Sequence, residues 1–259
     1  MFGYLRSVWD CRYFWLSLVR MDLRSRYRGS VLGMGWSLLN PVFMAAILCV
    51  AFQAIFKQDP LDFGLYLFAG LTVWNFVRDS TQQGCLSFFQ AEGYIRQFPA
   101  PMAIYPLRTV LGSSFHFLMA LALVFAVRFV LIGFSGMLSF VSLIPTVLMI
   151  FVVGWSLAVL AGFVTAYFPD MQHLAEVGLQ ILFYATPIVY PADRIGGNLG
   201  AVLACNPLAA FLEVLRAPVL HGEFPDPSRM ALAAVSTAVI VGAATLTLVR
   251  LQKKIIFQL

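Results

Sequence analysis

The chain has 259 residues, of which 61% are hydrophobic and only 11% are charged, and its formal net charge is +5. A soluble domain usually carries about 25% charged residues, so this chain has too few polar side chains to cover a globular surface. The composition therefore excludes a soluble domain. It predicts an all-α integral membrane protein, because a helix satisfies its backbone hydrogen bonds internally within the bilayer.

Residues 1–30 form an amphipathic segment in which apolar side chains recur at roughly helical intervals. The apolar set is Tyr4, Leu5, Val8, Trp9, Phe14, Trp15, Leu18 and Val19, and the charged set is Arg6, Asp10, Arg12 and Arg20. This pattern is typical of a helix lying in the membrane interface, with rings at the headgroup level and guanidinium groups towards phosphates. A plain basic flank before the first membrane span is the alternative.

Three glycines and one proline predict a bend between this interface helix and the first span. Gly29, Gly33 and Gly35 permit backbone conformations that other residues disfavour. Pro41 lies inside the first apolar run, where it predicts a kink or the start of the span. We expect these four residues to form a hinge.

Six apolar segments are predicted to cross the bilayer, which needs about 20 residues for each span. Four come from runs without any charged residue, 31–56, 109–127, 129–169 and 230–249. The run 129–169 has 41 residues, and its segment 133–136, with a glycine at each end, predicts a tight turn between two spans. Residues 62–84 and 174–190 are weaker candidates that complete the count of six.

Residues 86–106 form an aromatic and polar segment between the second and third spans. Pro99 and Pro101 predict a single short helix that ends before them. Aromatic side chains exposed on such a helix would form a knob that fits the groove of a partner protein. A simple interfacial loop is the alternative.

Residues 191–229 form a long region after the fifth span. Its stretch 195–212 has no charged side chain, but it contains three glycines, Asn206 and Pro207. Short re-entrant or interfacial helices fit this composition, since irregular backbone at membrane depth must be shielded by protein or line a cavity. A seventh span is the alternative, and it would move the C-terminus to the other side of the membrane.

The basic residues orient the six spans. With the N-terminus in the cytosol, 12 of the 17 Lys and Arg residues fall on the cytosolic side, as the positive-inside rule expects. Both termini are then cytosolic. Because the basic residues lie at the membrane ends and form no separate module, the charge does not indicate nucleic-acid binding.

Recognisable catalytic motifs are missing from the sequence, so no enzymatic activity, cofactor or metal site is expected. There is no GxxxxGK[ST] phosphate loop, HExxH, CxxC or GxSxG motif. We expect His116, within the third span, to be packed or hydrogen-bonded. Carboxylates are scarce inside the spans, so the energy for any transport against a gradient must come from another subunit.

Several segments resemble, in chain order, the motifs of the type-2 ABC exporter permeases that export O-antigen, capsule and wall teichoic acid. Residues 22–41 read DLRSRYRGSVLGMGWSLLNP, and they resemble the opening of these permeases closely. The further matches are YIRQFP at 94–99, YFPD at 167–170, ATPIVYP at 185–191, and NPL at 206–208 followed by Arg216.

This resemblance implies a single transmembrane permease domain over residues 1–259 that works as a homodimer in the bacterial inner membrane. Two separately encoded ABC ATPases would bind it and hold ATP and Mg, and the cargo would be an undecaprenyl-pyrophosphate-linked polysaccharide. Residues 1–30 would be the interface helix, 86–106 the coupling segment and 191–229 the outer gate.

The resemblance also implies roles for particular residues. The ATPase-coupling residues would be Phe88, Phe89, Glu92, Tyr94, Ile95, Arg96, Phe98 and Pro99. The lipid-pyrophosphate or interface residues would be Arg24, Arg26, Tyr27 and Arg28. The outer gate residues would be Pro187, Pro191, Asn206, Pro207 and Arg216.

Aromatic residues make up 15% of the chain, and their ring faces suit a sugar polymer that must slide along its path. The candidates for this path are Tyr66, Trp74, Phe76, Phe183, Tyr184 and Tyr190. Lipid-facing packing is the alternative for any one of them. The alternative cargo is a drug or small lipid, and a membrane-embedded transferase is disfavoured because the carboxylates show no paired spacing.

Overall fold

The computed structural model describes residues 2–30, 33–57, 59–98, 100–133, 136–191 and 206–258, and in these ranges every regular element is helical. The α-helices are α1 (Phe2–Asp10), α2 (Arg12–Tyr27), α3 (Trp36–Phe56), α4 (Pro60–Leu86), α5 (Glu92–Gln97), α6 (Ile104–Ile132), α7 (Leu143–Tyr167), α8 (Met171–Tyr184), α10 (Pro207–Arg216) and α11 (Pro227–Leu251). Shorter helical turns are η1 (Gly33–Gly35), η2 (Phe89–Ala91), η3 (Met137–Ser142), η5 (Ala217–His221) and η6 (Ile255–Phe257). The prediction of an all-helical protein is confirmed for these ranges.

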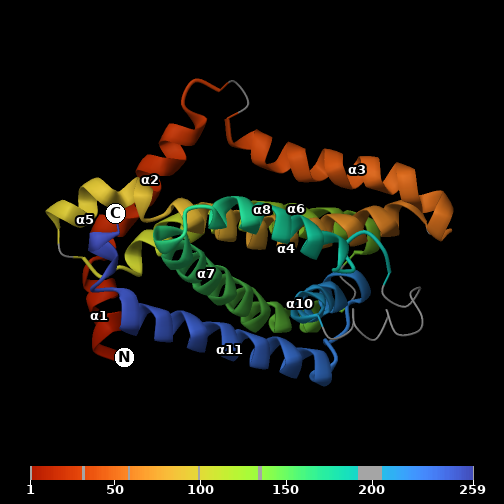
Figure 1. Cartoon of the computed structure of the whole chain (residues 1–259). Helices are drawn as coiled ribbons and strands as arrows, with labels where there is room; N and C mark the ends of the chain where they lie inside the picture. The colour runs from red at the N-terminus through yellow and green to blue at the C-terminus, as the bar shows by residue number, and fades with distance from the viewer. Residues whose placement is uncertain are drawn as a thin grey trace.

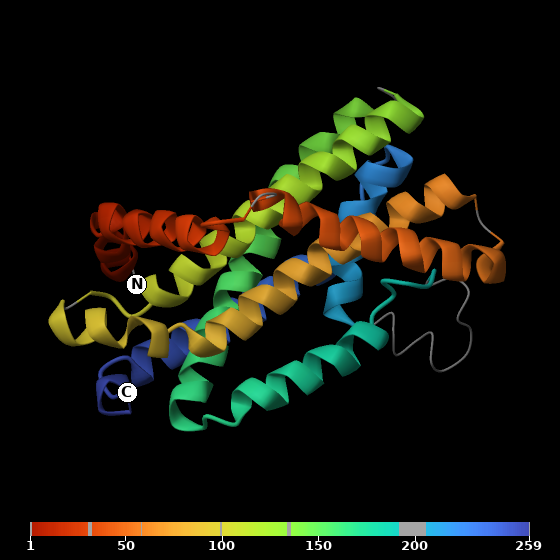
Figure 2. The same ribbon diagram turned by 90° about the horizontal axis from the view of Figure 1, so that it is seen from above.

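Helices α4 and α7 form the centre of the bundle. Helix α4 packs against α3, α6, α7 and α8, and α7 also packs against α11. Figure 1 shows α3 and α11 on opposite faces of this centre, and Figure 2 shows the same bundle from above. Helices α1 and α5 lie with both ends of the chain at one end of the bundle, here called the α5 end (Figure 1). Helix α10 lies towards the opposite end, called the α10 end.

The two central helices approach each other closely because small residues line their contact. A Cβ atom at Gly84 of α4 would lie 2.5 Å from Cα of Ala158 in α7. A Cβ atom at Gly154 of α7 would lie 2.6 Å from the ring of Phe76 in α4. Small residues at a helix contact allow the backbones to pack without a hydrophobic driving force in the bilayer.

Three helices begin at an Asp-Pro or Asn-Pro pair. Asp59, Asn206 and Asp226 are the N-caps of α4, α10 and α11, and each side chain accepts a hydrogen bond from a backbone N–H of the first turn. Proline follows each cap at the first helical position, where its missing N–H costs no hydrogen bond. These starts follow directly from local sequence.

The predicted hinge lies between α2 and α3. Helix α2 ends at Tyr27, and Gly29 and Gly33 adopt positive φ values of 80° and 50°. Gly35 ends the short turn η1, and Pro41 lies inside the first turns of α3. The glycines therefore occupy a change of chain direction, as the sequence predicts.

Four helical segments are long and apolar enough to cross a membrane: Gly33–Gln53, Ile104–Leu131, Met137–Tyr167 and Pro227–Leu251. Helix α4 has 27 residues, a length of about 40 Å, but it carries Asp62, Arg78 and Asp79. Helix α8 has only 14 residues, about 21 Å, which is shorter than the hydrocarbon core. By length and composition, four of the six predicted spans are therefore found among the described residues.

Candidate functional site

Two polar cavities lie on either side of the contact between α3 and α4. Each has a volume of about 350 Å³ (350 and 340 Å³), and both are lined by Asn40, Pro41, Asn75 and Arg78. Polar side chains at this depth in an apolar bundle are costly unless they serve binding or transport. The two cavities are therefore the first candidate for a functional site.

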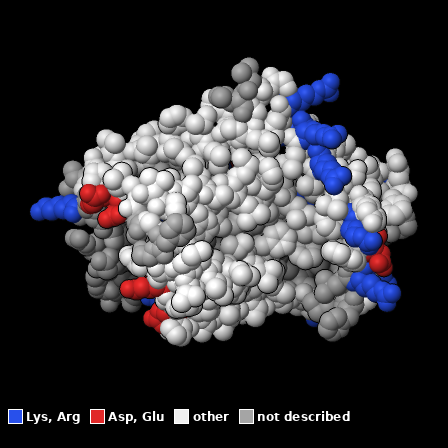
Figure 3. All heavy atoms as spheres, turned by 180° about the vertical axis from the view of Figure 1, so that it is seen from behind, with Lys and Arg blue, Asp and Glu red and all other residues white. Residues whose placement is uncertain are grey.

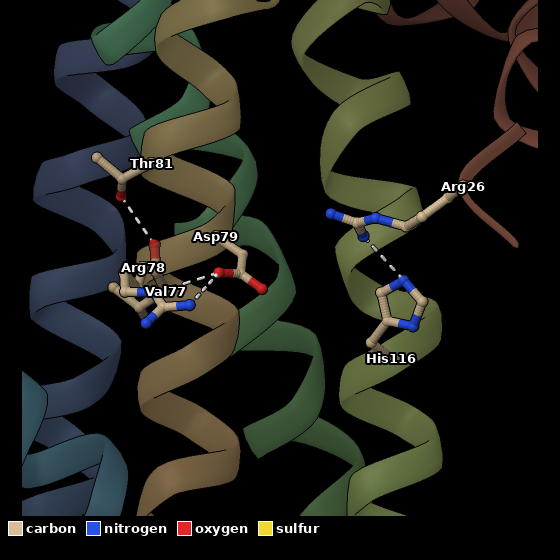
Figure 4. A network of polar contacts seen from close by, with 6 residues as sticks. All are labelled: Arg26, Val77, Arg78, Asp79, Thr81 and His116. Atoms are coloured by element: carbon tan, nitrogen blue, oxygen red, sulfur yellow. Dashed lines mark hydrogen bonds and ion pairs between the residues drawn. The ribbon is translucent and has the colours of Figure 1, made fainter. Parts of the chain in front are cut away.

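The first cavity, here called the histidine cavity, is bounded by α2, α3, α4 and α6. The guanidinium of Arg26 lies 3.1 Å from Nε2 of His116, and the hydroxyl of Tyr27 lies 3.1 Å from the same ring. The predicted hydrogen bonding of His116 is confirmed, and both partners come from α2; Figure 4 shows the contact with Arg26. Helix α2 is thus attached to α6 at this cavity.

On the α4 side of the same cavity, Arg78 and Asp79 form an ion pair with an N–O distance of 3.1 Å. Their side chains are 45% and 31% exposed, so this pair contributes little to stability. Figure 4 shows that Asp79 and His116 face each other across the space between α4 and α6. With Arg26 and Arg78 against a single Asp, the cavity carries excess positive charge and favours anionic groups.

The second cavity, here called the aromatic cavity, lies between α3, α4 and α8. Trp74 and Phe183 contact each other in its wall with ring centroids 5.4 Å apart, and Tyr184 lies beside them with its side chain 67% exposed. The polar members of the wall are Asn40, Asn75, Arg78, Gln82, Glu176 and Gln180. Ring faces next to amide donors and acceptors suit a ligand with many hydroxyl groups and flat apolar faces.

The structure divides the predicted path residues. Trp74, Phe183 and Tyr184 line the aromatic cavity, and Phe76 lies in the wall of the histidine cavity. Tyr66 and Tyr190 lie beyond the aromatic cavity, towards the α10 end. There Tyr66 donates hydrogen bonds to the carbonyls of Pro187 and Tyr190, and Tyr190 donates one to the carbonyl of Tyr184.

The arginines of the interface helix also divide into two sets. Arg20, Arg24 and Arg28 line a surface hollow along one face of α2, while Arg26 points towards His116. Figure 3 shows basic side chains in a row along the edge of the molecule that α2 forms. Arg20, Arg24 and Arg28 are spaced four residues apart, so they share one face of α2.

A bidentate ion pair fixes the middle of α2 to α6. Nε and Nη2 of Arg108 donate to the two carboxylate oxygens of Asp22. The side chain of Arg108 is 10% exposed and that of Asp22 is 40% exposed. Sequence reasoning missed this pair, because a charged residue at the end of an apolar run gives no sign of its partner.

The segment 86–106, predicted to couple to an ATPase, contains the short helix α5, preceded by the turn η2, and its coupling role stays a prediction. Phe88 and Ile95 are buried in a cluster with α1, α6, α7 and α11. Tyr94 and Phe98 contact the ring of Phe14 in α2, with centroids 5.9 and 5.6 Å apart. Glu92 and Arg96 form an exposed ion pair along one face of the helix. Pro99 lies outside the described residues.

Two large rings of this segment remain on the surface. Phe89 is 38% exposed and Phe98 is 49% exposed, whereas Phe88 is fully buried. The buried ring of Phe88 therefore anchors the segment, while the rings of Phe89 and Phe98 are exposed, as a docking surface would require.

Helix α1 supports the coupling segment from the other side. The hydroxyl of Tyr4 accepts a hydrogen bond from the backbone N–H of Ala103, and Val8 is buried in the same cluster. Burial raises the pKa of Tyr4 above its ordinary value, and the bond from Ala103 opposes part of this rise. Tyr4 is thus neutral at physiological pH.

The predicted outer gate residues meet at the α10 end. Arg216 donates from Nη1 to the carbonyl of Pro187, and Asn206 donates from its amide to the carbonyl of Ala185. Pro207 occupies the first position of α10, and Pro191 is the last described residue before the chain resumes at Asn206. Residues 192–205 of the predicted gate region lie outside the described residues.

Sequence reasoning also missed the amides of both cavities. Asn40 and Asn75 lie within segments predicted as spans, and a polar residue inside a span is itself a functional signal. That signal identifies the residues, but the crossing of α3 over α4 decides that they face the same space.

Long apolar helices packed around polar cavities define a multi-pass integral membrane protein. The model of one family, the ABC-2 type transporters, matches residues 13–220, which is most of the chain, and the chain belongs to this family. The resemblance seen in the motifs is thereby confirmed.

Three relatives cover most of the chain. An O-antigen export system permease protein RfbA from Klebsiella pneumoniae is 28% identical over 208 residues, 79% of each chain. The protein of the same name from Myxococcus xanthus is 26% identical over 251 residues, 95% of each chain. The polysialic acid transport protein KpsM from Escherichia coli is 22% identical over 217 residues, 81% of this chain and 82% of that protein.

Proposed function

We propose that the chain is the permease subunit of an ATP-driven exporter that moves a polysaccharide from the cytosol across the bacterial inner membrane. The observation that carries this proposal is the aromatic cavity, where Trp74, Phe183 and Tyr184 stand beside four amide side chains, Asn40, Asn75, Gln82 and Gln180. Relatives named for O-antigen export and polysialic acid transport support the same cargo class. A drug or small lipid is the alternative cargo, but it does not need this mixture of rings and amides.

The polymer path requires weak and repeated contacts. Ring faces let successive sugar units slide, while amides exchange hydrogen bonds with hydroxyl groups at little net cost. The absence of a deep binding minimum favours transport of a long chain. The histidine cavity adjoins this path through Asn75 and Arg78, and its positive charge suits the phosphate groups that link a glycan to its lipid.

The lipid anchor is undecaprenyl pyrophosphate, and the headgroup meets the arginines of α2. Arg24 and Arg28 face outwards with Arg20, and they hold phosphates of the membrane surface or the approaching headgroup. Arg26 and Tyr27 face the histidine cavity and take the headgroup further in. Guanidinium groups suit this role, since they donate two parallel hydrogen bonds to phosphate.

The energy comes from a separate ABC ATPase, which binds ATP and Mg and docks on the coupling segment. Two permease chains and two ATPases make the complete exporter. The chain crosses the membrane six times, with both termini in the cytosol. Helix α4 is one of the two polar spans along the path, and α8 together with the turn after it forms the other. The α5 end is then the cytosolic end of the bundle, and the α10 end is the outer end.

Replacement of Tyr184 by alanine tests the path. The side chain is 67% exposed, so its loss costs little stability but removes a ring face from the aromatic cavity. We expect Tyr184→Ala to lower surface polysaccharide severalfold, and Tyr184→Phe, which keeps the ring, to restore most of it. The measurement is the amount of surface polysaccharide per permease molecule in the membrane.

Phe257→Ala is the control, because Phe257 is also exposed, at 86%, but lies in the turn η6 after α11 and lines neither cavity. Unchanged export by Tyr184→Ala, with the ATPase still bound, would remove the aromatic cavity from the path.

A further inference from the structure

Arg216 is almost fully buried, at 5% exposure, and it donates hydrogen bonds to the turn 185–191, which has no regular structure. Its Nη1 donates to the carbonyl of Pro187 at 2.8 Å. Its Nη2 donates to the carbonyls of Ile188 at 3.1 Å and of Tyr66 at 3.2 Å. The guanidinium carbon also lies 3.5 Å from the centre of the Tyr66 ring. One side chain thus connects α10, α4 and the turn after α8.

Tyr66 completes this arrangement from the α4 side. Its hydroxyl shares its single hydrogen between the carbonyls of Pro187 and Tyr190, with O–O distances of 3.2 and 3.0 Å. Together Arg216 and Tyr66, here called the clasp, bind three carbonyls of the turn 185–191. A buried carbonyl outside a helix needs such a donor, since the apolar surroundings provide none.

The turn held by the clasp begins directly after the end of the aromatic cavity. Helix α8 ends at Tyr184, and Phe183 and Tyr184 are the members of the cavity wall closest to the turn. Tyr190 returns to this point and donates a hydrogen bond to the carbonyl of Tyr184 at 2.8 Å. The position of both rings therefore depends on the position of the turn.

We propose that Arg216 and Tyr66 are positioning residues for export: the clasp holds the turn 185–191 so that Phe183 and Tyr184 face the path. This inference rests on the proposed function for its meaning in export, while the geometry of the clasp stands without it. The clasp uses arginine because only a planar guanidinium can stack on a ring and donate to several carbonyls at once.

Gly70 provides a way to disturb the clasp without changing either of its members. A Cβ atom at Gly70 would overlap Nη2 of Arg216, so alanine there must displace the guanidinium. Gly112 is the matched control, because it also lies within a helix and a Cβ atom there meets nothing within 4 Å. Gly→Ala within a helix is otherwise neutral or favourable.

The experiment uses the assembled exporter in native membranes, with the four native cysteines replaced and Tyr184→Cys as a reporter. We expect Gly70→Ala and Arg216→Lys each to change the rate of reporter modification by a maleimide severalfold, and Gly112→Ala to leave it unchanged. With Tyr184 intact, the same two variants should lower surface polysaccharide severalfold. Tyr66→Phe removes only the hydroxyl, with the hydrogen bond shared between the two carbonyls, and keeps the stacked ring, so it should have a smaller effect of the same sign.

Membrane content and ATPase binding of each variant show whether it folds. If Gly70→Ala and Arg216→Lys fail to accumulate in the membrane, Tyr66→Phe is tested instead, by the rate of reporter modification and by the amount of surface polysaccharide. Reporter rates equal to the parent in folded variants would overturn the clasp. Another outcome is a clasp variant that changes the rate of reporter modification and still exports polysaccharide fully, while Tyr184→Ala lowers export. That result would show that the clasp does not position the rings for export. If deletion of the whole gene leaves surface polysaccharide normal, the proposed function is wrong. The rates of reporter modification then still test whether the clasp holds the turn 185–191.

Discussion

Replacement of Phe89 by glutamate releases the ATPase from the permease while the permease itself remains folded. Phe89 is 38% exposed on the coupling segment, next to Phe88, which is fully buried. Aromatic rings are enriched in protein interfaces, and loss of a ring that dominates an interface costs about 2 kcal/mol or more. A carboxylate in the partner's groove adds a desolvation cost, so we expect at least about a 30-fold loss of ATPase affinity. The measurement is co-purification of the ATPase with the permease.

Phe98→Glu should act in the same direction, since Phe98 is 49% exposed on the same segment. Phe224→Glu is the control, because this ring is also exposed but lies near the α10 end. Phe88→Glu must be avoided as a test, since a charge in the buried cluster would unfold the segment. Full ATPase binding by both Phe89→Glu and Phe98→Glu would mean that the coupling segment is not the docking surface.

Loss of the carboxylate at Asp22 detaches the interface helix from α6. Asp22→Ala leaves the guanidinium of Arg108 without its bidentate partner, and Arg108 is only 10% exposed. Breaking a fully buried pair costs about 3–5 kcal/mol, and the 40% exposure of Asp22 reduces the expected loss to about 1–3 kcal/mol. We expect a lower thermal stability in detergent and faster proteolysis within α2. Surface polysaccharide should fall as well, because α2 carries Arg26 to the histidine cavity.

The exchanged pair Asp22→Arg with Arg108→Asp separates the interaction from the individual residues. It restores an ion pair between α2 and α6, and part of the stability should return. Asp10→Ala is the control for the loss of one negative charge near the N-terminus, since Asp10 ends α1 and lies on the surface. Equal stability of Asp22→Ala and the parent protein would show that packing alone holds α2 in place.

The features that the sequence predicts well are those decided by local chemistry. The apolar runs give four membrane-length helices, and the glycines at 133 and 136 mark the end of α6 and the start of η3. Helix α5 ends at Gln97, before the predicted stop, and Gly29 and Gly33 take positive φ where the chain turns. Each of these depends on a single residue type and its immediate neighbours.

The features that the sequence does not predict are the choices of partner across helices. Arg24, Arg26 and Arg28 look alike in the sequence, yet Arg26 binds His116 while the other two face outwards. Tyr66 looks like a path residue, but its ring lies against Arg216. Both outcomes depend on how helices cross, and no local pattern encodes that crossing.

The number of membrane spans is also hard to predict from the sequence, because the count depends on how the helices pack. Helix α4 is the most polar of the long helices, and it lies in the centre of the bundle, shielded on several sides by other helices. Five of its polar residues lower its mean hydropathy and line the two cavities: Thr72, Asn75, Arg78, Asp79 and Gln82. Hydropathy measures a helix alone, so it gives a low value to a helix whose polar face lines a cavity inside a bundle.

The location of finished polysaccharide in a strain that lacks this gene tests the central claim most directly. The proposed function predicts that complete lipid-linked polymer accumulates on the cytosolic side of the inner membrane and disappears from the cell surface. Expression of the intact chain should restore the surface polymer, and expression of Phe89→Glu should not. Normal surface polysaccharide in the deletion strain would contradict the account and would assign the exporter to another cargo.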